Sequence, residues 1–291
     1  MTNADGVTSM DAVTNLIAAD PHADRAARAA GVVVRELAAI DDFAAVCRLF
    51  QDIWRPPPEN PLATTELLRA LTKAGNYLAG AFDGDRLVAA CVGFFGAPAD
   101  GTMHSHIAGV TPAMAGRSVG YALKLHQRAW ALRRGVGAIA WTFDPLVARN
   151  AYFNLAKLGA TAAEYLPDFY GDMPDALNGG DETDRLLVHW DLRAPAVVAA
   201  CGGRAHLVRH QHAAVALGRT PAGAPEPGER DAATLLVAVP ADVATLRATD
   251  PAMATRWRMA VRDVLGGLLA DGARVAGFDR AGWYVLTRED T

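Results

Sequence analysis

The sequence predicts a mixed α/β protein, with a central sheet flanked by helices and a smaller α/β segment at the C-terminal end. Three observations support this prediction. Apolar residues recur at helical spacing over 43–53, whereas 138–143 is continuously apolar, as in a buried strand. Asp-Gly at 83–84 joins two apolar runs, which is a strong hairpin signal. A strand-like run that stops near Pro112 leads through small residues into a further helix.

The composition indicates a globular protein and excludes several kinds of partner. Of the 291 residues, 51% are hydrophobic and 21% are charged, which is enough for a sizeable core. The formal net charge is -4 and no Lys/Arg run is interleaved with aromatic residues, so we expect no nucleic-acid partner. No apolar run approaches the roughly 20 residues that span a bilayer, so we expect no membrane partner.

The cysteines point to a reducing compartment. Cys47, Cys91 and Cys201 lie far apart, are odd in number and include no C-x-x-C pair. We therefore expect reduced thiols and a cytoplasmic protein.

The core elements are expected between residues 31 and 193, after a flexible tail or a single loose helix at 1–30. A proline-rich loop at 56–61 could close over a substrate. In chain order we expect a strand at 32–37, helices at 40–53 and 64–73, strands at 77–82, 87–95 and 103–110, a helix at 120–134, a strand at 138–143, a helix at 150–158, and strands at 160–165 and 185–190.

Residues 194–291 are expected to form a C-terminal α/β extension that packs on the core or mediates a homodimer. Its first part, 194–232, is dominated by Ala, Gly, Pro and His and contains a linker-like loop at 220–228. Asp250-Pro251 is an N-cap followed by a first-turn proline. The expected elements are a strand at 234–240, a helix at 250–270, and strands at 275–278 and 283–287.

The turn after Pro112 has the composition of a phosphate site. Small residues at 113–120 place free backbone N–H groups at the start of a helix, where anions bind. A lone G-x-x-x-G, as at Gly116 and Gly120, would equally fit an ordinary βα turn. The spacing around it is more specific.

V-T-P at 110–112 followed by G-R-S-V-G at 116–120 resembles the acyl-CoA signature of the GNAT superfamily of N-acyltransferases, V-x-P and then [Q/R]-x-x-G-x-[G/A]. Two registers are open. R-x-x-G-x-A from Arg117 fits the letters, whereas counting from Pro112 puts Ala115 at the Gln/Arg position and Ser118 at the first glycine. We prefer the second register, because strand-loop-helix geometry fixes the distance from the proline.

The resemblance implies a GNAT-like core over 31–193, with acetyl-CoA or another short acyl-CoA as the acyl donor. Asn150 resembles the family asparagine that binds the pantetheine arm, although helix N-capping is an alternative. The residues expected to bind the donor are Ala108, Gly109, Val110, Gly116, Arg117, Ser118, Val119, Gly120, Tyr121 and Asn150.

Two histidines are the candidate general bases. His104 and His106 occupy the strand where the family often carries its base, and a histidine near its ordinary pKa of about 6.5 suits deprotonation at neutral pH. Alternatively, they hydrogen-bond within a half-buried sheet. No matching Cys or carboxylate spacing accompanies them, so we expect no metal. We interpret the histidines of H-x-x-x-H-x-H at 206–212 as surface residues.

The family's usual general acid is missing. Leu155 stands where the family motif Y-x-K-x-G has its tyrosine. We favour Tyr170, in a loop between the last two core strands, although it could equally be a structural tyrosine. Asp144 ends a strand and could orient an acceptor ammonium or a histidine, or simply open a turn.

We therefore predict an N-acyltransferase that acts on the primary amine of a small molecule, such as an amino acid, by direct attack. The chain looks like an uncharacterised bacterial GNAT branch, some relatives of which are associated with amino-acid acylation, including succinylation. Two alternatives are a non-catalytic acyl-CoA-binding regulatory module and a protein or peptide N-acyltransferase.

Overall fold

The computed structural model describes residues 20–171, 173 and 180–288. The chain divides into two compact units, one made of Met1–Ile53 and Pro61–Ile139 and the other of Trp54–Asn60 and Ala140–Thr291. The predicted domains divide the chain at residue 193 instead. The two divisions differ because residues 140–193 and residues 194–291 are joined by hydrogen bonds and ion pairs within the second unit.

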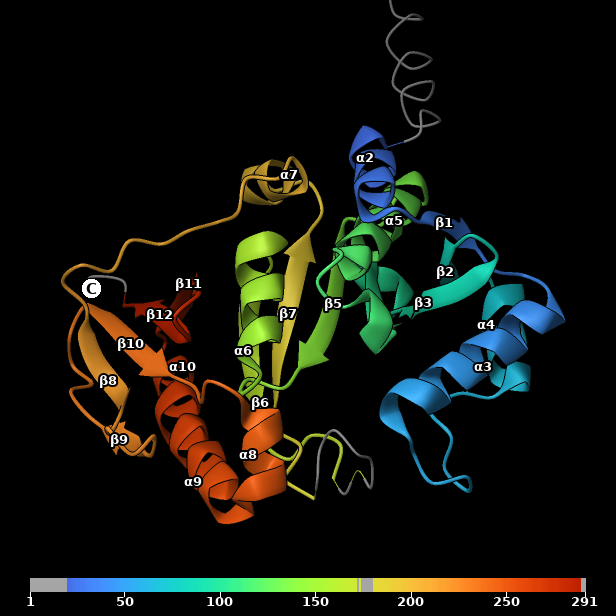
Figure 1. Ribbon diagram of the computed structural model, residues 1–291. Coiled ribbons are helices and arrows are strands. Elements are labelled where there is room, and N and C mark those ends of the chain that lie inside the picture. Colours follow the sequence, from blue (N-terminus) through green and yellow to red (C-terminus); the bar gives the residue numbers. More distant parts are fainter. Residues whose placement is uncertain (1–19, 172, 174–179, 289–291) are drawn as a thin grey trace, which may run out of the picture. The chain divides into compact units, whose positions relative to one another are not determined.

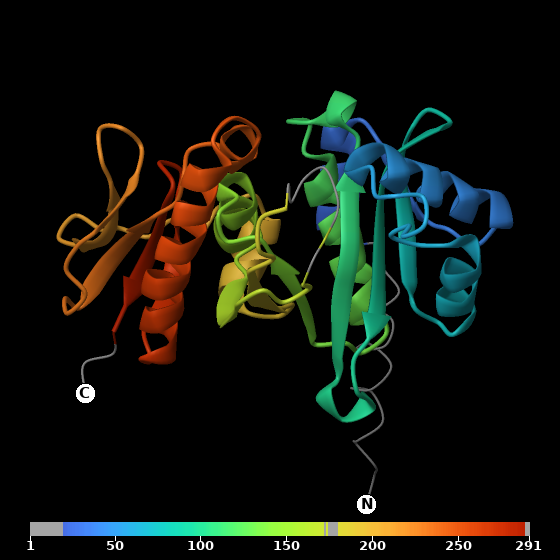
Figure 2. The ribbon, with the colours of Figure 1, turned by 90° about the horizontal axis from the view of Figure 1, so that it is seen from below.

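The first unit contains a meander of antiparallel strands. Its members are β1 (Val33–Glu36), β2 (Tyr77–Asp83), β3 (Arg86–Phe95) and β4 (Thr102–Val110), each paired with the next. The turn after Asp83 contains Gly84 at φ 58°, which confirms the predicted hairpin. Figure 2 shows β3 and β4 side by side along most of their length.

Helices flank these strands much as their apolar spacing predicts. In α3 (Ile40–Trp54) the buried residues are Phe43, Val46, Leu49 and Phe50, which recur at helical spacing. In α4 (Thr65–Lys73) the Thr64 side chain accepts the Leu67 amide, as an N-cap does. The remaining elements of this unit are α2 (Pro21–Ala30), α5 (Val119–Arg133), and the short 3₁₀ turns η1 (Pro98–Asp100) and η2 (Pro112–Met114).

Helix α2 corrects the prediction of a flexible tail, as far as the described residues go. Asp20 caps it by accepting the His22 amide (2.9 Å), and Gly31 ends it at φ 67°. Figure 1 shows α2 lying against α5, and the Asp20 carboxylate accepts from Arg128 (3.1 Å) of that helix. Residues 1–19 lie outside the described part of the chain.

The buried face of α2 consists of alanines, at 23, 26 and 30. Beyond Pro21 the apolar residues of α2 are all alanines, the exposed Ala29 included, so no large apolar side chain marks the buried face in the sequence.

The second unit begins with the elements that complete the predicted core. They are β5 (Ala138–Phe143), which starts at the boundary between the units, α6 (Ala148–Ala151), the π-helical turn η3 (Tyr152–Lys157), β6 (Thr161–Leu166) and β7 (Arg185–Asp191). Strands β6 and β7 pair antiparallel. The predicted helix at 150–158 is thus one turn of α-helix continued by a π-helical turn, and it ends at Gly159 (φ 69°) as expected.

A second sheet in this unit has the strand order β11-β12-β10-β8-β9, in which β8 and β10 are parallel. The predicted C-terminal strands and long helix are confirmed, and the structure adds α7, β8, β9 and α8. The bounds are α7 (Pro195–Cys201), β8 (Ala214–Arg219), β9 (Pro225–Pro227), β10 (Thr234–Ala238), α8 (Val243–Thr249), α9 (Pro251–Val261), the π-helical turn η4 (Arg262–Gly266), α10 (Gly267–Ala270), β11 (Arg274–Asp279) and β12 (Trp283–Thr287).

The fold is therefore mixed α/β, as predicted, with a smaller C-terminal sheet. Strand β9 lies within the predicted linker at 220–228, where prolines at both ends of a three-residue edge strand hide the strand pattern. Trp257 is fully buried on the inner face of α9, and its indole N–H donates to Gly223 O (3.0 Å). No helix in the described part of the chain is long and apolar enough to cross a membrane.

The packing of α2 can be tested with a matched pair of substitutions. We expect Ala23→Glu to lower the free energy of unfolding by about 2 kcal/mol or more, because it buries a carboxylate against α5. Ala29→Glu lies on the exposed side of the same helix and should change it little. Thermal unfolding of both variants measures the difference, and equal melting temperatures would show that α2 is not docked.

Candidate functional site

Strand β4 carries the two candidate base histidines beside Phe94 of β3. His104 pairs with Phe94, and His106 is the extra residue at a β-bulge, since Ser105 and Ile107 pair with consecutive residues of β3. The Phe94 ring centroid lies 5.2 Å from that of His104 and 5.7 Å from that of His106, and the two imidazole centroids are 6.0 Å apart. The two histidines and Phe94 therefore form one cluster of aromatic rings.

Both imidazoles favour the neutral form. Burial lowers the pKa of the half-buried His104, and the charges of His106 and Lys124 lower it further. Burial also lowers the pKa of His106. Because both pKa values lie below 6.5, the rings are uncharged at pH 7, which is the state in which an imidazole accepts a proton.

A buried lysine connects β4 to α5. The Lys124 ammonium donates to Ser105 Oγ (3.0 Å) and to Gln127 Oε1 (3.0 Å), and Gln127 Nε2 donates to Cys91 Sγ (3.4 Å). Burial lowers the pKa of Lys124 to about 8, so most of it is charged at pH 7. Ser105 lies between the two histidines in sequence, so this network attaches the part of β4 that carries them to α5.

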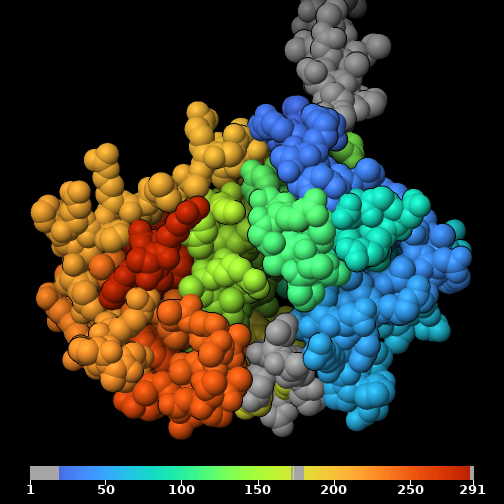
Figure 3. Space-filling view, in the orientation of Figure 1, coloured from blue at the N-terminus to red at the C-terminus, as the bar shows by residue number. Residues whose placement is uncertain are grey.

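The turn after β4 contains backbone conformations that are uncommon for its residues. The chain leaves β4 at Val110, passes through η2 and enters α5 at Val119. Gly116 (φ 80°) and Ser118 (φ 61°) both adopt left-handed conformations. Residues 115–118 are exposed, and Figure 3 shows this green part of the chain at the surface.

Ser118 adopts the conformation that glycine favours. A non-glycine residue at positive φ costs about 1–3 kcal/mol, and such residues concentrate at ligand-binding turns. In the register counted from Pro112, Ser118 takes the place of the first signature glycine. Its φ of 61° is a conformation that glycine adopts readily, and the choice between the two registers stays a prediction.

The first turn of α5 offers amide groups to a ligand. The helix's first i→i−4 hydrogen bond runs from Ala122 N to Ser118 O (3.1 Å), so the amides of Val119 and Gly120 precede the intrahelical ladder. The helix dipole adds about half a positive charge at this end. A Cβ on Gly120 would lie 3.6 Å from Val110 Cγ2, an ordinary contact, so a side chain fits there.

The other predicted donor-binding residues of this unit lie around the turn. The exposed Arg117 guanidinium lies 3.8 Å from Asp83 Oδ2 and donates to Met114 Sδ (3.2 Å). Ala108, Gly109 and Val110 pair with Cys91, Ala90 and Ala89 of β3. Tyr121 is half-buried in the first turn of α5. Their roles toward a donor stay predictions.

Asn150 lies in the second unit and is not a helix N-cap. Val147 occupies the N-cap position of α6, and the Asn150 amide donates to Val147 O (2.9 Å). The alternative explanation for this asparagine therefore does not apply, and its role toward pantetheine stays a prediction. Leu155, which replaces the family tyrosine, is buried in the π-helical turn.

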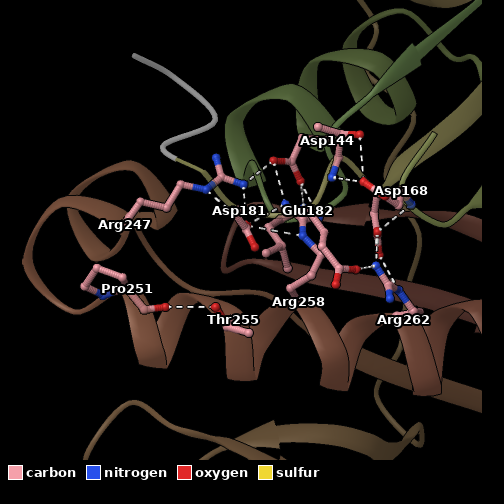
Figure 4. Close-up of polar contacts among 12 residues, drawn as sticks. Asp144, Asp168, Asp181, Glu182, Arg247, Pro251, Thr255, Arg258 and Arg262 are labelled. Carbon is pink, nitrogen blue, oxygen red and sulfur yellow. Dashed lines mark hydrogen bonds and ion pairs between the residues drawn. The ribbon is translucent and has the colours of Figure 1, made fainter. Parts of the chain in front are cut away.

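Asp144 lies in a buried ion cluster (Figure 4). Its two carboxylate oxygens accept a fork of hydrogen bonds from Arg258 (2.9 and 3.0 Å), and Arg247 adds another (2.6 Å). Burial alone would raise the pKa of Asp144, but the two guanidinium groups outweigh it and lower the pKa to about 2. An acceptor ammonium would have to displace an arginine to bind this carboxylate.

Tyr170 remains accessible and is held by polar contacts. It is exposed over 39% of its surface, its hydroxyl lies 3.1 Å from Thr142 Oγ1, and the Arg185 guanidinium lies over its ring at 5.3 Å. Its role as a proton donor stays a prediction.

The structure adds residues that sequence reasoning missed. A lysine is usually exposed, and no local signal in the sequence marks the burial of Lys124. The arginines of α8 and α9 find their acidic partners about a hundred residues away, which no local pattern reveals. The predicted surface histidines are partly engaged, because His206 Nε2 contacts Ala276 O (3.0 Å) and His210 lies 3.5 Å from Asp279.

Residues 22–153 match the family model described as Acetyltransferase (GNAT) domain. This range contains β4, the turn and α5, so the histidines and the helix N-terminus belong to an acyltransferase domain. Over these residues the chain carries a GNAT acetyltransferase domain, which supports an acyl-CoA-dependent N-acyltransferase. No curated protein shows significant sequence similarity to the chain.

Several solved structures are similar over roughly half of the chain. YncA from Salmonella typhimurium, a putative acetyltransferase with its cofactor acetyl-CoA, is 17% identical over 57% of this chain and 98% of its own, with a TM-score of 0.46. The ribosomal-protein-S18-alanine N-acetyltransferase from Escherichia coli is 13% identical over 56% and 95%, with a TM-score of 0.44. The ribosomal-protein-S5-alanine acetyltransferase from Vibrio fischeri is 14% identical over 56% and 94%, with a TM-score of 0.46.

The electrostatic link between Lys124 and His104 predicts a direction of change. Replacing the buried ammonium by Lys124→Met removes a positive charge, so the pKa of His104 should rise from its lowered value toward 6.5. Lys124→Arg keeps the charge and serves as the control. The histidine ring protons, followed by NMR as pH is varied, report both pKa values.

The lowered pKa of His104 should also make the free energy of unfolding depend on pH. A histidine whose pKa is lowered by folding binds protons better when unfolded, so its protonation destabilises the fold as pH falls below about 6.5. A wild-type His104 that titrates above 6.5, or a pKa unchanged by Lys124→Met, would contradict the link.

Proposed function

We propose that the domain transfers an acetyl or other short acyl group from acyl-CoA to the primary amine of a small molecule, with amino acids as the first class to test. The attack is direct. Cys91 is fully buried and burial raises the pKa of its thiol, which gives no support to an acyl-cysteine intermediate. The observation that carries the proposal is the succession of β4, the positive-φ turn and α5.

Acyl transfer to an amine makes three chemical demands. The ammonium must lose a proton, the carbonyl oxygen must be stabilised as it gains charge, and the thiolate must be protonated or screened. We assign the first role to His104 or His106, whose lowered pKa values keep them neutral. We assign proton delivery to Tyr170, the accessible phenol of the second unit.

The pyrophosphate of coenzyme A would bind the amides at the start of α5. Val119 and Gly120 supply N–H donors, and the positive end of the helix dipole favours the anion. Coenzyme A supplies the activated acyl group as a thioester. The amides of Val119 and Gly120 then bind its phosphates, and His104 or His106 takes up the proton of the amine.

One alternative has a specific feature in its favour. With Leu155 in place of the family tyrosine, the domain could bind acyl-CoA without turning it over. A thiol-release assay with acyl-CoA and a pool of amines separates the two cases, because a non-catalytic binder would be thermally protected by CoA but release no thiol. Adding peptides with free N-termini to the pool distinguishes small-molecule from peptide or protein acceptors.

Two further expectations accompany this proposal. We expect the protein to act in the cytoplasm, where acyl-CoA is available, and residues 194–291 to include a homodimer surface. Light scattering of the purified protein tests the latter.

The phosphate turn can be tested at Gly120. Gly120→Glu should weaken CoA binding by about 100-fold or more, because the carboxylate occupies the anion site and repels the diphosphate. The melting temperature of the ligand-free protein should be nearly unchanged, since the position has room for a side chain. Calorimetry measures the binding.

Gly120→Ala is the matched control. Its methyl group fits against Val110 and removes no amide, so CoA affinity should stay within about threefold of wild type. Unaltered binding by Gly120→Glu would show that the turn is structural only.

A further inference from the structure

The C-terminal extension contributes three arginines to the loop between β6 and β7. Figure 4 shows Arg247 of α8, Arg258 of α9 and Arg262 of η4 pointing toward acidic side chains at the end of β5 and in that loop. Arg247 and Arg258 each bind Asp181 (both 2.9 Å) as well as Asp144. One set of guanidinium groups thus joins two segments of the acyltransferase core to the extension.

Most of this cluster is buried. The side chain of Arg258 is 1% exposed and that of Asp184 is 0% exposed, whereas Arg262 keeps 23%. Buried charges of this kind need their partners, because losing one leaves the other without compensation. The extension is therefore bound to Asp144 and to acidic residues of 181–184 by ion pairs, and breaking the buried ones would cost much free energy.

A chain of hydrogen bonds runs from Arg262 to the backbone of Tyr170. Arg262 Nε donates to Asp184 Oδ2 (2.9 Å), and Asp184 Oδ1 accepts the amide of Asp168 (3.0 Å). The Asp168 carboxylate accepts the Thr183 amide (3.1 Å), and Thr183 Oγ1 accepts the Tyr170 amide (2.9 Å). Each link holds the next in place.

The backbone after β6 adopts an unfavourable conformation that these hydrogen bonds stabilise. Asp168 has φ 41°, in the left-handed region that non-glycine residues rarely adopt. The Asp184 carboxylate also accepts the Tyr165 hydroxyl (2.6 Å), so one buried group fixes both the end of β6 and the loop after it. Arg262 is the cation of the extension that hydrogen-bonds this carboxylate, and the charge of Arg258 adds a smaller attraction.

We propose that Arg262 is a positioning residue that holds Tyr170 through Asp184, Asp168 and Thr183, which makes residues 194–291 a working part of the acyltransferase. The proposal rests on the proposed role of Tyr170 as proton donor. It also implies that the extension is not a separable regulatory domain, since the core loop depends on it for a counter-charge.

A double-mutant cycle tests the proposal. Arg262→Gln should lower kcat by about tenfold and leave the KM for acyl-CoA within about twofold, because the donor turn is untouched. Arg262→Lys keeps the charge and should recover most of the loss. In a Tyr170→Phe background Arg262→Gln should have little further effect, since both changes remove the same function.

Amide hydrogen exchange provides the readout that does not depend on activity. Arg262→Gln should speed exchange at residues 167–171, and Arg256→Gln, an exposed arginine on α9, should not. Thr183→Val, which loses the acceptor hydroxyl, should reproduce the effect, whereas Thr183→Ser should not. If Arg262→Gln fails to fold, the comparison of Thr183→Val with Thr183→Ser still tests the chain of hydrogen bonds.

Three results would overturn the proposal. They are unchanged exchange at 167–171 in Arg262→Gln and Thr183→Val, an unchanged kcat, or independent, multiplicative losses in the double variant. If the wild-type protein transfers no acyl group at all, the proposed function fails instead, and the exchange experiment alone decides whether Arg262 holds the loop.

Discussion

The register of β4 against β3 is the constraint on which the site depends. Pairing runs from Met103 opposite Phe95 to Val110 opposite Ala89, and it stops where Pro112 has no amide to give. The end of the strand fixes where the turn begins, and the two left-handed residues of the turn fix where α5 begins. The bulge at His106 places both imidazoles next to Phe94. A shift of one residue would turn His104 to the other face.

The same helix serves the site in two ways. Its N-terminal amides face the exposed turn, and one turn further along Lys124 reaches back under β4 to Ser105. The strand that carries the histidines is therefore tied to the helix that would hold the phosphates. A buried ammonium also keeps a positive charge near His104, which favours the neutral imidazole. The link between β4 and α5 and the lowered pKa of His104 therefore both involve Lys124.

Features set by local pattern could be predicted from the sequence. The hairpin at Gly84, the end of β4 before Pro112 and strand β5 at 138–143 lie where Asp-Gly, proline and a continuous apolar run place them. Features that depend on tertiary contacts could not. The buried face of α2 carries alanines alone and no large apolar residue marks it, and the burial of Lys124 depends on its contact with Ser105 of β4. Asp144 ends its strand as predicted, but its arginine partners come from the far end of the chain.

The proposed function depends above all on the binding of the coenzyme A diphosphate by the amides at the start of α5. The most direct measurement is a titration of ¹⁵N-labelled protein with CoA, followed through backbone amide chemical shifts. We predict the largest saturable changes at Gly116, Ser118, Val119 and Gly120, because hydrogen bonds to phosphate deshield the donating amides. Saturable shifts that map to another surface and spare these four residues would contradict the claim, as would spectra that do not change at millimolar CoA.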